Sequence, residues 1–358
     1  MKIVLAADRA DSAGIGTVVR GLCASLPAAL PDGYELLLVG GPRDGEVPAK
    51  VVRILGPRRR NGRLTRFLFE QGRVASVSRR ADFVHQTDYR ALLVSGKPFL
   101  ITVHDAAFLD HPQWYPPVIA RFKRAMLSAA LAKKPRAIVC ASEFTRSRLL
   151  EHHPLAAALD VRVIYSGVET PPADVVPLEA DEPYFLTIST IEPRKNHLGL
   201  LEAFRRARTN GLALRWKVAG APGYGSGRII AALRAAEGVD VLGWVDNATR
   251  ERLYGGALFV ATPSHVEGFG FPPLEAMARG VPTITSAGSA MDETVGDASR
   301  RVEPDDVVGW EQAIADLATQ EVERERLRRR GFEQPARFGW GRAARAYVDL
   351  YGDVGRDA

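Results

Sequence analysis

The sequence predicts an α/β protein made of two doubly wound domains, and three observations support this prediction. The chain has 358 residues, more than a single hydrophobic core usually serves. Short apolar runs of strand length alternate with helical stretches, as in parallel sheets that helices cover on both faces. A segment rich in proline and acidic residues interrupts the alternation near the middle of the chain, and the alternation then restarts.

The first domain is expected at residues 1–168. It opens with the apolar run Ile3–Ala7, a buried strand by its length, and a glycine loop and an amphipathic helix follow. Five further apolar runs predict strands, in chain order Glu35–Val39, Phe83–His85, Phe99–Val103, Ala137–Cys140 and Val161–Ile164. Helical stretches separate most of these strands, which favours a parallel sheet.

Residues 169–183, with the sequence ETPPADVVPLEADEP, hold four prolines and five acidic residues and predict an interdomain linker. The second domain is expected at residues 184–339. Its predicted strands are Tyr184–Ser189, Arg215–Ala219, Val239–Leu242, Leu258–Thr262 and Thr283–Thr285. Its predicted helices are Asn196–Arg208, after the first strand, and Gly227–Ala236, after the second. Residues 340–358 place Trp340, Tyr347 and Tyr351 on one helical stripe, which must be buried against another part of the protein.

The composition is that of a soluble globular protein, with 46% hydrophobic and 25% charged residues. No apolar run approaches the roughly 20 residues that a membrane span needs. The N-terminus passes from a short apolar run directly into charged residues, without the pattern of a secretory signal. Cys23 and Cys140 have no metal-binding or redox spacing, so a reduced, cytoplasmic setting is expected.

The net charge of +6 is unevenly distributed along the chain. Residues 1–168 have a net charge of +11 and residues 169–358 a net charge of −5. The excess is sharpest in Arg53–Arg80, where nine arginines face only Glu70. This asymmetry favours different partners for the two halves, although a solvated basic face explains it as well.

Glycines and polar residues gather just after predicted strands, where ligands of open α/β sheets bind. Gly14 and Gly16 open a helix, and their backbone N–H groups could meet a ligand, or they could form a plain strand-to-helix turn. His104 ends the run FLITV and is a candidate ligand contact, although a lone histidine there is more often structural. With two such domains, the natural site is the cleft between them.

The stretch EPRKNH places Arg194 and Lys195 at a predicted helix start, where cations oppose the helix dipole. A bound anion would explain them, because arginine offers a planar fork, lysine a point charge and the helix end free N–H groups. The alternative is that Glu192 pairs with them at the surface.

The stretch HVEGFGFPPLEAMARGVP places Glu267 and Glu275 eight positions apart, on either side of a glycine loop and a Pro-Pro step. Carboxylates in this arrangement can accept hydrogen bonds from vicinal hydroxyls. The alternatives are helix-dipole compensation for Glu275 and a surface acid for Glu267, and neither explains both residues together with the loop. Both carboxylates are expected in an open cleft rather than in a core.

An anion site and two hydroxyl-binding carboxylates in one cleft predict a ligand with phosphates and sugars, which is a sugar nucleotide. The chain has no Asp-x-Asp pair, so a metal-bridged diphosphate is not expected and no metal ligand is predicted. Arg194, Lys195 and helix ends would have to stabilise the phosphate charge instead.

These residues resemble the Glu-(seven residues)-Glu signature of the retaining glycosyltransferases of family 4, which have the GT-B fold of two Rossmann-like domains facing a central cleft. Further stretches resemble family segments in family order: AGIGTVVRGL, VHDAAFLDHPQWYP, IYSGVE, EPRKNHLGLLEAF, VLGWVDNATRERLYGGALFVATPS and VGDASRRVEPDD. Together they cover most of the chain. The resemblance implies an acceptor-binding domain at 1–168, a donor-binding domain at 184–339 and a final helix that crosses back onto the first domain.

The resemblance also implies roles for single residues. Glu275 would hold the donor's ribose, and Glu267 would hold the hexose and diphosphate with the backbone of Gly268, Phe269 and Gly270. Arg194 and Lys195 would bind the diphosphate and stabilise the leaving nucleotide, with Gly14 and Gly16 closing nearby. His104 would contact the hexose near the reacting carbon. The loop from Gly243 to Val245 would meet the base through its backbone.

The sequence departs from the family pattern at two places. Close members often carry a basic residue after the Gly-Ile-Gly, where this chain has Thr17. Many members have Leu-Pro-Glu where this chain has Met291-Asp292-Glu293. The first departure puts a basic contact to acceptor or phosphate in doubt, and the second affects the fine geometry of the loop.

The resemblance therefore implies a cytoplasmic, metal-independent, retaining hexosyltransferase without a cofactor, similar to mannosyl- and rhamnosyl-type transferases of polysaccharide assembly. Its partners would be a nucleotide-sugar donor, with GDP-mannose the first expectation, and a glycan, lipid-linked or small-molecule acceptor. Peripheral contact with an anionic inner membrane face through the N-terminal domain fits the arginine excess. The alternatives are a GT-B epimerase or phosphorylase, a non-catalytic nucleotide-sugar binder and, with no binding motif in support, a nucleic-acid-binding protein.

Overall fold

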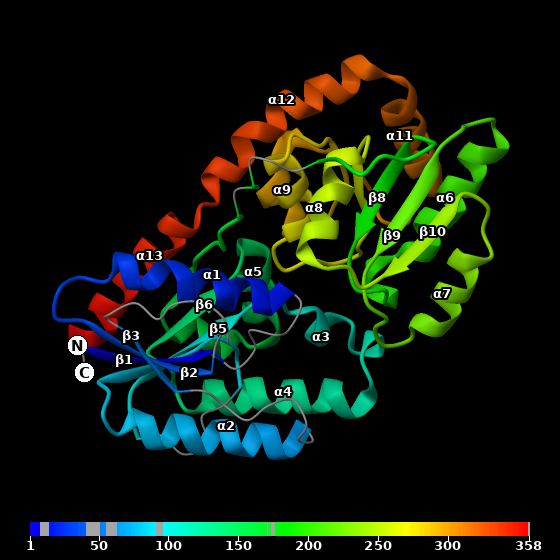
Figure 1. The fold of residues 1–358 in the computed structure, drawn as a ribbon. Helices are drawn as coiled ribbons and strands as arrows, with labels where there is room; N and C mark the ends of the chain where they lie inside the picture. The colour runs from blue at the N-terminus through cyan, green and yellow to red at the C-terminus, as the bar shows by residue number, and fades with distance from the viewer. Residues whose placement is uncertain are drawn as a thin grey trace. The chain divides into compact units, whose positions relative to one another are not determined.

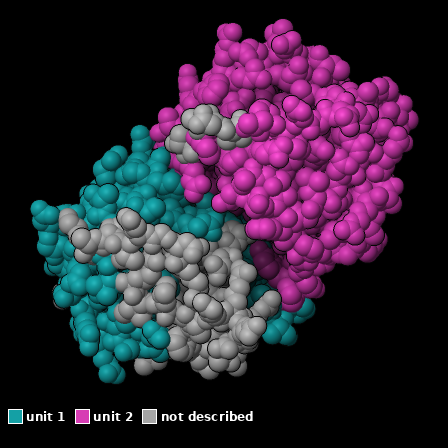
Figure 2. All heavy atoms as spheres, viewed as in Figure 1, with its two compact units in different colours: residues 1–110, 117–167, 339–358 teal, residues 111–116, 168–338 magenta. Residues whose placement is uncertain are grey.

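The computed structural model describes residues 1–7, 14–40, 51–54, 63–90, 96–169, 171–172 and 176–356. The chain forms two compact units, coloured teal and magenta in Figure 2. Unit 1 comprises residues 1–110, 117–167 and 339–358, and unit 2 comprises residues 111–116 and 168–338. The short stretch 111–116 therefore belongs to unit 2, although the sequence analysis placed it within the first domain.

Unit 1 contains a seven-stranded parallel sheet with the strand order β3-β2-β1-β4-β5-β6-β7. Its strands are β1 (Lys2–Ala7), β2 (Glu35–Gly40), β3 (Val51–Ile54), β4 (Phe83–Gln86), β5 (Phe99–Val103), β6 (Ala137–Cys140) and β7 (Val161–Val163). The order reverses between β1 and β4, which is the topological switch point of a doubly wound sheet. The edge strand β3 was not predicted, because it is short and lies inside the basic stretch.

The helices of unit 1 cover both faces of this sheet (Figure 1). They are α1 (Gly14–Ala29), α2 (Arg63–Ser78), α3 (Ala107–Asp110), α4 (Pro117–Ala132), α5 (Glu143–His152), the 3₁₀ helix η2 (Pro154–Ala158) and α13 (Trp340–Arg356). The final helix α13 lies beside α1 and buries Tyr347 and Tyr351, the stripe expected from the sequence. The Tyr351 hydroxyl lies 2.7 Å from Nδ1 of the buried His85, so a polar contact helps to fix α13 on the sheet.

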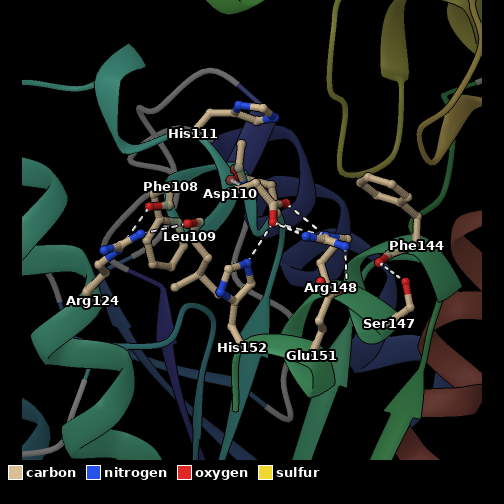
Figure 3. Close-up of polar contacts among 12 residues, drawn as sticks. Phe108, Leu109, Asp110, His111, Arg124, Phe144, Ser147, Arg148, Glu151 and His152 are labelled. Atoms are coloured by element: carbon tan, nitrogen blue, oxygen red, sulfur yellow. Dashed lines mark hydrogen bonds and ion pairs between the residues drawn. The ribbon is translucent and has the colours of Figure 1, made fainter. Parts of the chain in front are cut away.

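A charged cluster fixes the end of α3 in unit 1, as Figure 3 shows. Asp110 accepts hydrogen bonds from Arg148 Nε at 3.0 Å and lies 2.7 Å from Nε2 of His152, both on α5. Arg124 on α4 donates to the carbonyls of Phe108 and Leu109. Burial would raise the pKa of Asp110, but Arg148 and His152 lower it below its ordinary value. Ionised Asp110 thus ties α3 to its neighbours directly before the chain passes to unit 2.

Unit 2 contains a six-stranded parallel sheet with the order β10-β9-β8-β11-β12-β13. Its strands are β8 (Tyr184–Ile188), β9 (Arg215–Ala219), β10 (Val239–Gly243), β11 (Val260–Thr262), β12 (Thr283–Ser286) and β13 (Arg300–Val302). The sequence analysis missed β13, whose Arg300 and Arg301 are exposed and give no apolar signal.

Two apolar clusters fill the two faces of this sheet, and Figure 1 shows the helices that cover them. One face packs against α6 (His197–Thr209), α7 (Ser226–Arg234) and α11 (Val307–Thr319) around Trp216. The other face packs against α8 (Asn247–Gly256) and α9 (Phe271–Ala278). The remaining helices of unit 2 are η1 (Pro112–Trp114), η3 (Pro193–Lys195), α10 (Met291–Val295), η4 (Gly296–Ala298) and α12 (Glu321–Arg337).

Part of the expected linker packs on unit 2. The backbone N–H of Leu178 donates to the carbonyl of Arg252 at 2.8 Å, and Pro177 lies against Gly255 of α8. These contacts anchor the C-terminal part of the linker, which limits its freedom as a hinge.

Among the described residues, no helix has both the length and the apolar character to cross a membrane. Arg58, Arg59 and Arg60, at the centre of the basic stretch Arg53–Arg80, lie outside the described residues.

Candidate functional site

The predicted site residues lie in both units. Gly14, Gly16 and His104 belong to unit 1. The others belong to unit 2, namely Arg194, Lys195, Gly243, Val245, Glu267, Gly268, Phe269, Gly270 and Glu275. In each unit these residues follow strands. Because parallel strands all end at the same edge of their sheet, the residues of one unit lie at one edge of that unit's sheet.

The two cations lie on a separate turn before α6, and not on the first turn of that helix as expected. Arg194 and Lys195 belong to the 3₁₀ helix η3, and Asn196 follows with a left-handed backbone (φ 52°). The Asn196 side chain donates to the carbonyl of Pro304 at 2.7 Å, which fixes this break in the chain. The cations therefore do not oppose the dipole of α6 directly, and a neighbouring carboxylate stabilises their charges.

Glu267 supplies that support. The Lys195 Nζ donates to Glu267 Oε1 at 2.5 Å, and the hydroxyl of Ser264 donates to the same oxygen at 2.7 Å. Arg194 Nη1 lies 3.5 Å from Glu267 Oε2 and donates to the carbonyl of Val266 at 2.8 Å. Only 8% of Lys195 and 8% of Glu267 are exposed. Two cations and one carboxylate thus form a compact buried cluster after β8 and β11.

The cluster keeps Glu267 ionised. Burial would raise the pKa of Glu267, but the charges of Lys195 and Arg194 and the hydrogen bonds from Lys195 and Ser264 lower it to about 2. Burial and the charge of Arg194 lower the pKa of Lys195, while Glu267 favours its charged form. Glu192 also pairs with Arg194, at 2.9 Å. The Glu192 pairing weighed in the sequence analysis therefore exists, but it reaches only one of the two cations.

The glycine loop after Glu267 leads directly into α9. Gly270 has a φ of 90°, and a Cβ there would lie 2.8 Å from the Met291 side chain, so glycine is needed. The hydroxyl of Thr294 donates to the carbonyl of Phe269 at 2.9 Å. Pro272 occupies the first turn of α9, as the sequence predicts.

Glu275 is the fifth residue of α9, and 9% of it is exposed. The hydroxyl of Tyr254 donates to Glu275 Oε2 at 2.9 Å, and Arg250 Nη1 lies 3.9 Å from Oε1. Because α9 has no acidic residue in its first turn, dipole compensation does not explain Glu275. Both glutamates are buried, contrary to the open surroundings expected from the sequence, because side chains from α8, η3 and the β11 loop cover them.

Five residues that support the two glutamates were not predicted from the sequence: Ser264, Arg250, Glu251, Tyr254 and Arg279. Arg279 pairs with Glu251, donates to the backbone carbonyl of Glu275 at 2.7 Å and lies over the Tyr254 ring. The Nε of Arg250 is buried and has no hydrogen-bond partner. The one signal in the sequence was the spacing of Arg250 and Tyr254, which puts both on one face of α8.

The loop after β10 is open at its glycine. Gly243 has a φ of 73°, and its carbonyl accepts a hydrogen bond from Gly220 N–H at 2.7 Å. Within the part of the chain that the structure describes, no atom would lie within 4 Å of a Cβ at Gly243. Val245 packs against the apolar cluster beneath α8, whereas Trp244 between them is 74% exposed.

In unit 1, His104 is buried at the end of β5, with its Nε2 2.6 Å from the carbonyl oxygen of Thr87. This contact makes Nε2 the donor and fixes the ring. Gly14 begins α1, and no atom of the described residues would lie within 4 Å of a Cβ there. Gly16 is buried in the same first turn.

Comparisons with known proteins identify the family of the chain. The family model "Glycosyltransferase Family 4" matches residues 12–171, and the model "Glycosyl transferases group 1" matches residues 173–334. The O-antigen chain mannosyltransferase B of Escherichia coli is 28% identical over 287 residues, which cover 74% of this chain and 75% of that protein. The O-antigen chain mannosyltransferase RfbU of Salmonella typhimurium is 27% identical and covers 61% of this chain and 60% of that protein.

Solved structures support the same fold. Sucrose-phosphate synthase from Thermosynechococcus elongatus matches with a TM-score of 0.78 and 20% identity, over all of both chains. Anabaena HepE, solved in complex with UDP and glucose, matches with a TM-score of 0.75 and 16% identity, over 99% of this chain and all of that chain. The two family models together span nearly the whole sequence, and the chain belongs to the family 4 glycosyltransferases as a hexosyltransferase of the GT-B fold.

Proposed function

We propose that this enzyme transfers a hexose from a nucleoside diphosphate sugar to an acceptor hydroxyl and retains the configuration at the reacting carbon. The observation that carries the proposal is the buried cluster of Arg194, Lys195 and Glu267 after β8 and β11. Two cations held in place by protein carboxylates form a preorganised site for the negative charge of a departing diphosphate.

In the proposed reaction the bond between the hexose C1 and the diphosphate oxygen breaks, and C1 bonds to the acceptor oxygen. The transition state resembles an oxocarbenium ion, and Lys195 and Arg194 stabilise the leaving diphosphate. Glu267 is already paired with both cations, which makes it a poor nucleophile toward C1. We therefore favour attack from the face of the leaving group, with the acceptor proton passing to a diphosphate oxygen.

The other carboxylate fits the ribose of the donor. Glu275 receives one neutral hydrogen bond, from Tyr254, so its remaining lone pairs can accept from two vicinal hydroxyls. The Gly243–Val245 loop then meets the base with its backbone, and His104 contacts the hexose. GDP-mannose is the first donor to test, supported by the mannosyltransferase names of the relatives.

The acceptor of the proposed reaction is a glycan or lipid-linked sugar of polysaccharide assembly, with a small-molecule acceptor as the alternative. The described surface of unit 1 offers one support for a membrane-bound acceptor. Residues 117–142 contain no acidic residue, and α4 exposes the apolar Val118 and Phe122 beside Arg121. Exposed basic and aromatic side chains on one helix favour peripheral binding to an anionic lipid surface.

A donor screen tests the proposal directly. Thermal shift with the GDP, UDP, ADP and TDP forms identifies the nucleotide, and turnover of the matching sugar nucleotide is then followed by NMR with and without EDTA. We expect stabilisation by GDP, slow hydrolysis of GDP-mannose to α-mannose as the first product, and rates that EDTA leaves unchanged. A product with the β configuration would contradict retention, and loss of activity in EDTA would contradict metal independence.

The rival functions give different outcomes in the same screen. An epimerase changes the donor sugar without an acceptor, and a phosphorylase needs inorganic phosphate. A non-catalytic binder is stabilised by the nucleotide but shows no turnover. A nucleic-acid-binding protein is retained on nucleic acid at moderate salt whether or not sugar nucleotide is present.

A further inference from the structure

A short aromatic segment from outside the main body of unit 2 packs on the loop that carries Glu267. Residues 111–116 belong to unit 2, whereas residues 110 and 117 on either side belong to unit 1. The segment contains the 3₁₀ helix η1, which ends at Trp114. Neither the motifs nor the proposed reaction gives this segment a role.

The Trp114 ring makes near-parallel contacts with two histidine rings. Its centroid is 4.0 Å from that of His111, with an interplanar angle of 25°, and 5.5 Å from that of His265, with an angle of 20°. These two contacts connect Trp114 to the loop that carries Glu267.

His265 connects this stack to the charged cluster. The backbone N–H of His265 donates to the carbonyl of Arg194 at 3.0 Å, and Arg194 Nη1 donates to the carbonyl of Val266 at 2.8 Å. These two hydrogen bonds join the η3 turn to the segment that leads to Glu267. The ring of His265 contacts Trp114. Its Nδ1 lies 3.8 Å from Asp305 Oδ1.

We propose that Trp114 is a positioning residue. It holds His265 in place and thereby fixes the positions of Glu267 and Arg194 relative to Lys195. Near-parallel rings with centroids about 4.5–7 Å apart form a favourable contact, so the stack restrains the backbone of residues 264–267. A displacement of about 1 Å at a catalytic group can lower a rate roughly a hundredfold. The effect on turnover rests on the proposed function, whereas the effect on loop order does not.

Two variants of one residue test the proposal. Trp114→Ala removes the stack, and Trp114→Phe keeps an aromatic ring at the same place. We expect Trp114→Ala to lower kcat about tenfold, while donor KM and the affinity for free nucleotide change less than about twofold, because the Glu275 side is untouched. Trp114→Phe should recover most of kcat. Phe332→Ala, which removes an exposed aromatic ring from α12, is the matched control and should leave kcat unchanged.

Hydrogen exchange gives a readout that does not depend on activity. Amides of residues 264–268 should exchange faster in Trp114→Ala than in the wild type, and at the wild-type rate in Trp114→Phe and Phe332→Ala. If Trp114→Ala is too unstable to measure, His265→Leu removes the other half of the stack and should give the same pattern.

The outcomes separate this proposal from the proposed function. A lower melting temperature in Trp114→Ala with unchanged kcat and unchanged exchange of residues 264–268 would make Trp114 purely structural and overturn the proposal. If the wild type proves inactive with every sugar nucleotide, the proposed function fails, and faster exchange in Trp114→Ala would still support the positioning of the loop.

Discussion

The surroundings of Glu267 and of Glu275 differ sharply, although the two carboxylates lie only eight residues apart. Glu267 is paired with Lys195 and Arg194 and accepts a further hydrogen bond from Ser264. Glu275 accepts one hydrogen bond from the neutral Tyr254, and Arg250, its nearest cation, stands 3.9 Å away. One carboxylate is thus neutralised within the protein, whereas the other keeps much of its capacity to accept hydrogen bonds.

This difference assigns different work to the two residues. In the proposed reaction Glu267 would hold Lys195 and Arg194 at the leaving diphosphate, so its effect on the reaction would pass through these two cations. The Tyr254 hydroxyl donates to the Glu275 carboxylate, and Arg279 donates to the Glu275 backbone carbonyl. In the proposed site the remaining lone pairs of Glu275 would accept hydrogen bonds from the ribose. We therefore expect changes near Glu267 to affect turnover and folding, and changes near Glu275 to affect nucleotide affinity.

The largest expected effect follows from removing Lys195, one of the two cations of the Glu267 cluster. Lys195→Ala should lower kcat by roughly a hundredfold to a thousandfold, the usual loss for one charge-stabilising donor. It should also lower the free energy of unfolding by about 3 kcal/mol, because the Glu267 charge loses its main buried partner. Steady-state kinetics and urea unfolding measure the two losses.

The double variant Lys195→Met with Glu267→Gln separates these losses. It removes both charges, so its free energy of unfolding should lie closer to that of the wild type than that of Lys195→Ala does. Its kcat should stay as low as that of Lys195→Ala. Recovery of kcat in the double variant would mean that Lys195 serves only the fold.

The second prediction compares the two glutamates directly. Glu275→Ala should weaken the binding of free nucleotide about tenfold to a hundredfold. This range corresponds to the loss of roughly 1.5–3 kcal/mol that is typical of a hydrogen bond to a charged group. Glu267→Ala should not weaken that binding, because Lys195 and Arg194 keep their charges for the diphosphate of the nucleotide. It should lower kcat and stability, because Lys195 is left as a buried unpaired charge. Calorimetry with the nucleotide alone decides between the two, and equal losses in both variants would contradict the division of roles.

The sequence predicted the two carboxylates and the two cations but not their surroundings. Strand ends, glycines and the spacing of Glu267 and Glu275 are local signals that a single sequence shows. The parallel sheet then brings the loops after β8 and β11 together, so that Lys195 meets Glu267. Tyr254 and Ser264 reach the glutamates from other elements, and a single sequence contains no signal for such pairing. The burial of both glutamates was missed for the same reason, because the covering side chains come from distant segments.

The fold was predicted in the same uneven way. Strands such as β5, β6 and β9 have the predicted bounds, because each is a clean apolar run between turns. The strand β13 has arginine at two of its three positions and shows no such run. The place of residues 111–116 in unit 2 depends on ring contacts of Trp114, which no local pattern predicts.

The third prediction tests the support behind Glu275. Tyr254→Phe removes the hydroxyl that donates to Glu275, and we expect nucleotide affinity to fall about fivefold, for a loss of roughly 1 kcal/mol. Tyr184→Phe is the matched control, because it removes a buried hydroxyl whose acceptor is the carbonyl of Leu253. The control should lower stability by a similar amount without changing affinity. An affinity loss in both variants would point to a general loosening of α8.

The smallest expected effect at neutral pH concerns His197, which is buried beside the Glu267 cluster. Burial, followed by the charge of Lys195, lowers the pKa of His197 to about 3. Its Nε2 lies 3.3 Å from the Ser189 hydroxyl, and its Nδ1 has no partner, so no carboxylate stabilises the charged ring. In unit 1, burial, followed by His104, lowers the pKa of His85 to about 3 as well, between the hydroxyls of Tyr351 and Thr102.

Both histidines are neutral in the folded protein, and an unfolded histidine binds its proton near pH 6.5. The unfolded state therefore takes up more protons than the folded state between about pH 6.5 and 3, and the free energy of unfolding falls as the pH drops through this window, by about 1.4 kcal/mol per pH unit for each histidine. Glu267, with a pKa of about 2, acts in the same direction but only at lower pH, where its unfolded form begins to bind protons. His197→Leu should thus remove one histidine's share of the slope between pH 6 and pH 5 while costing little at pH 7.5. Urea unfolding at these pH values measures the slope, and an unchanged slope in His197→Leu would show that His197 is already protonated in the folded protein.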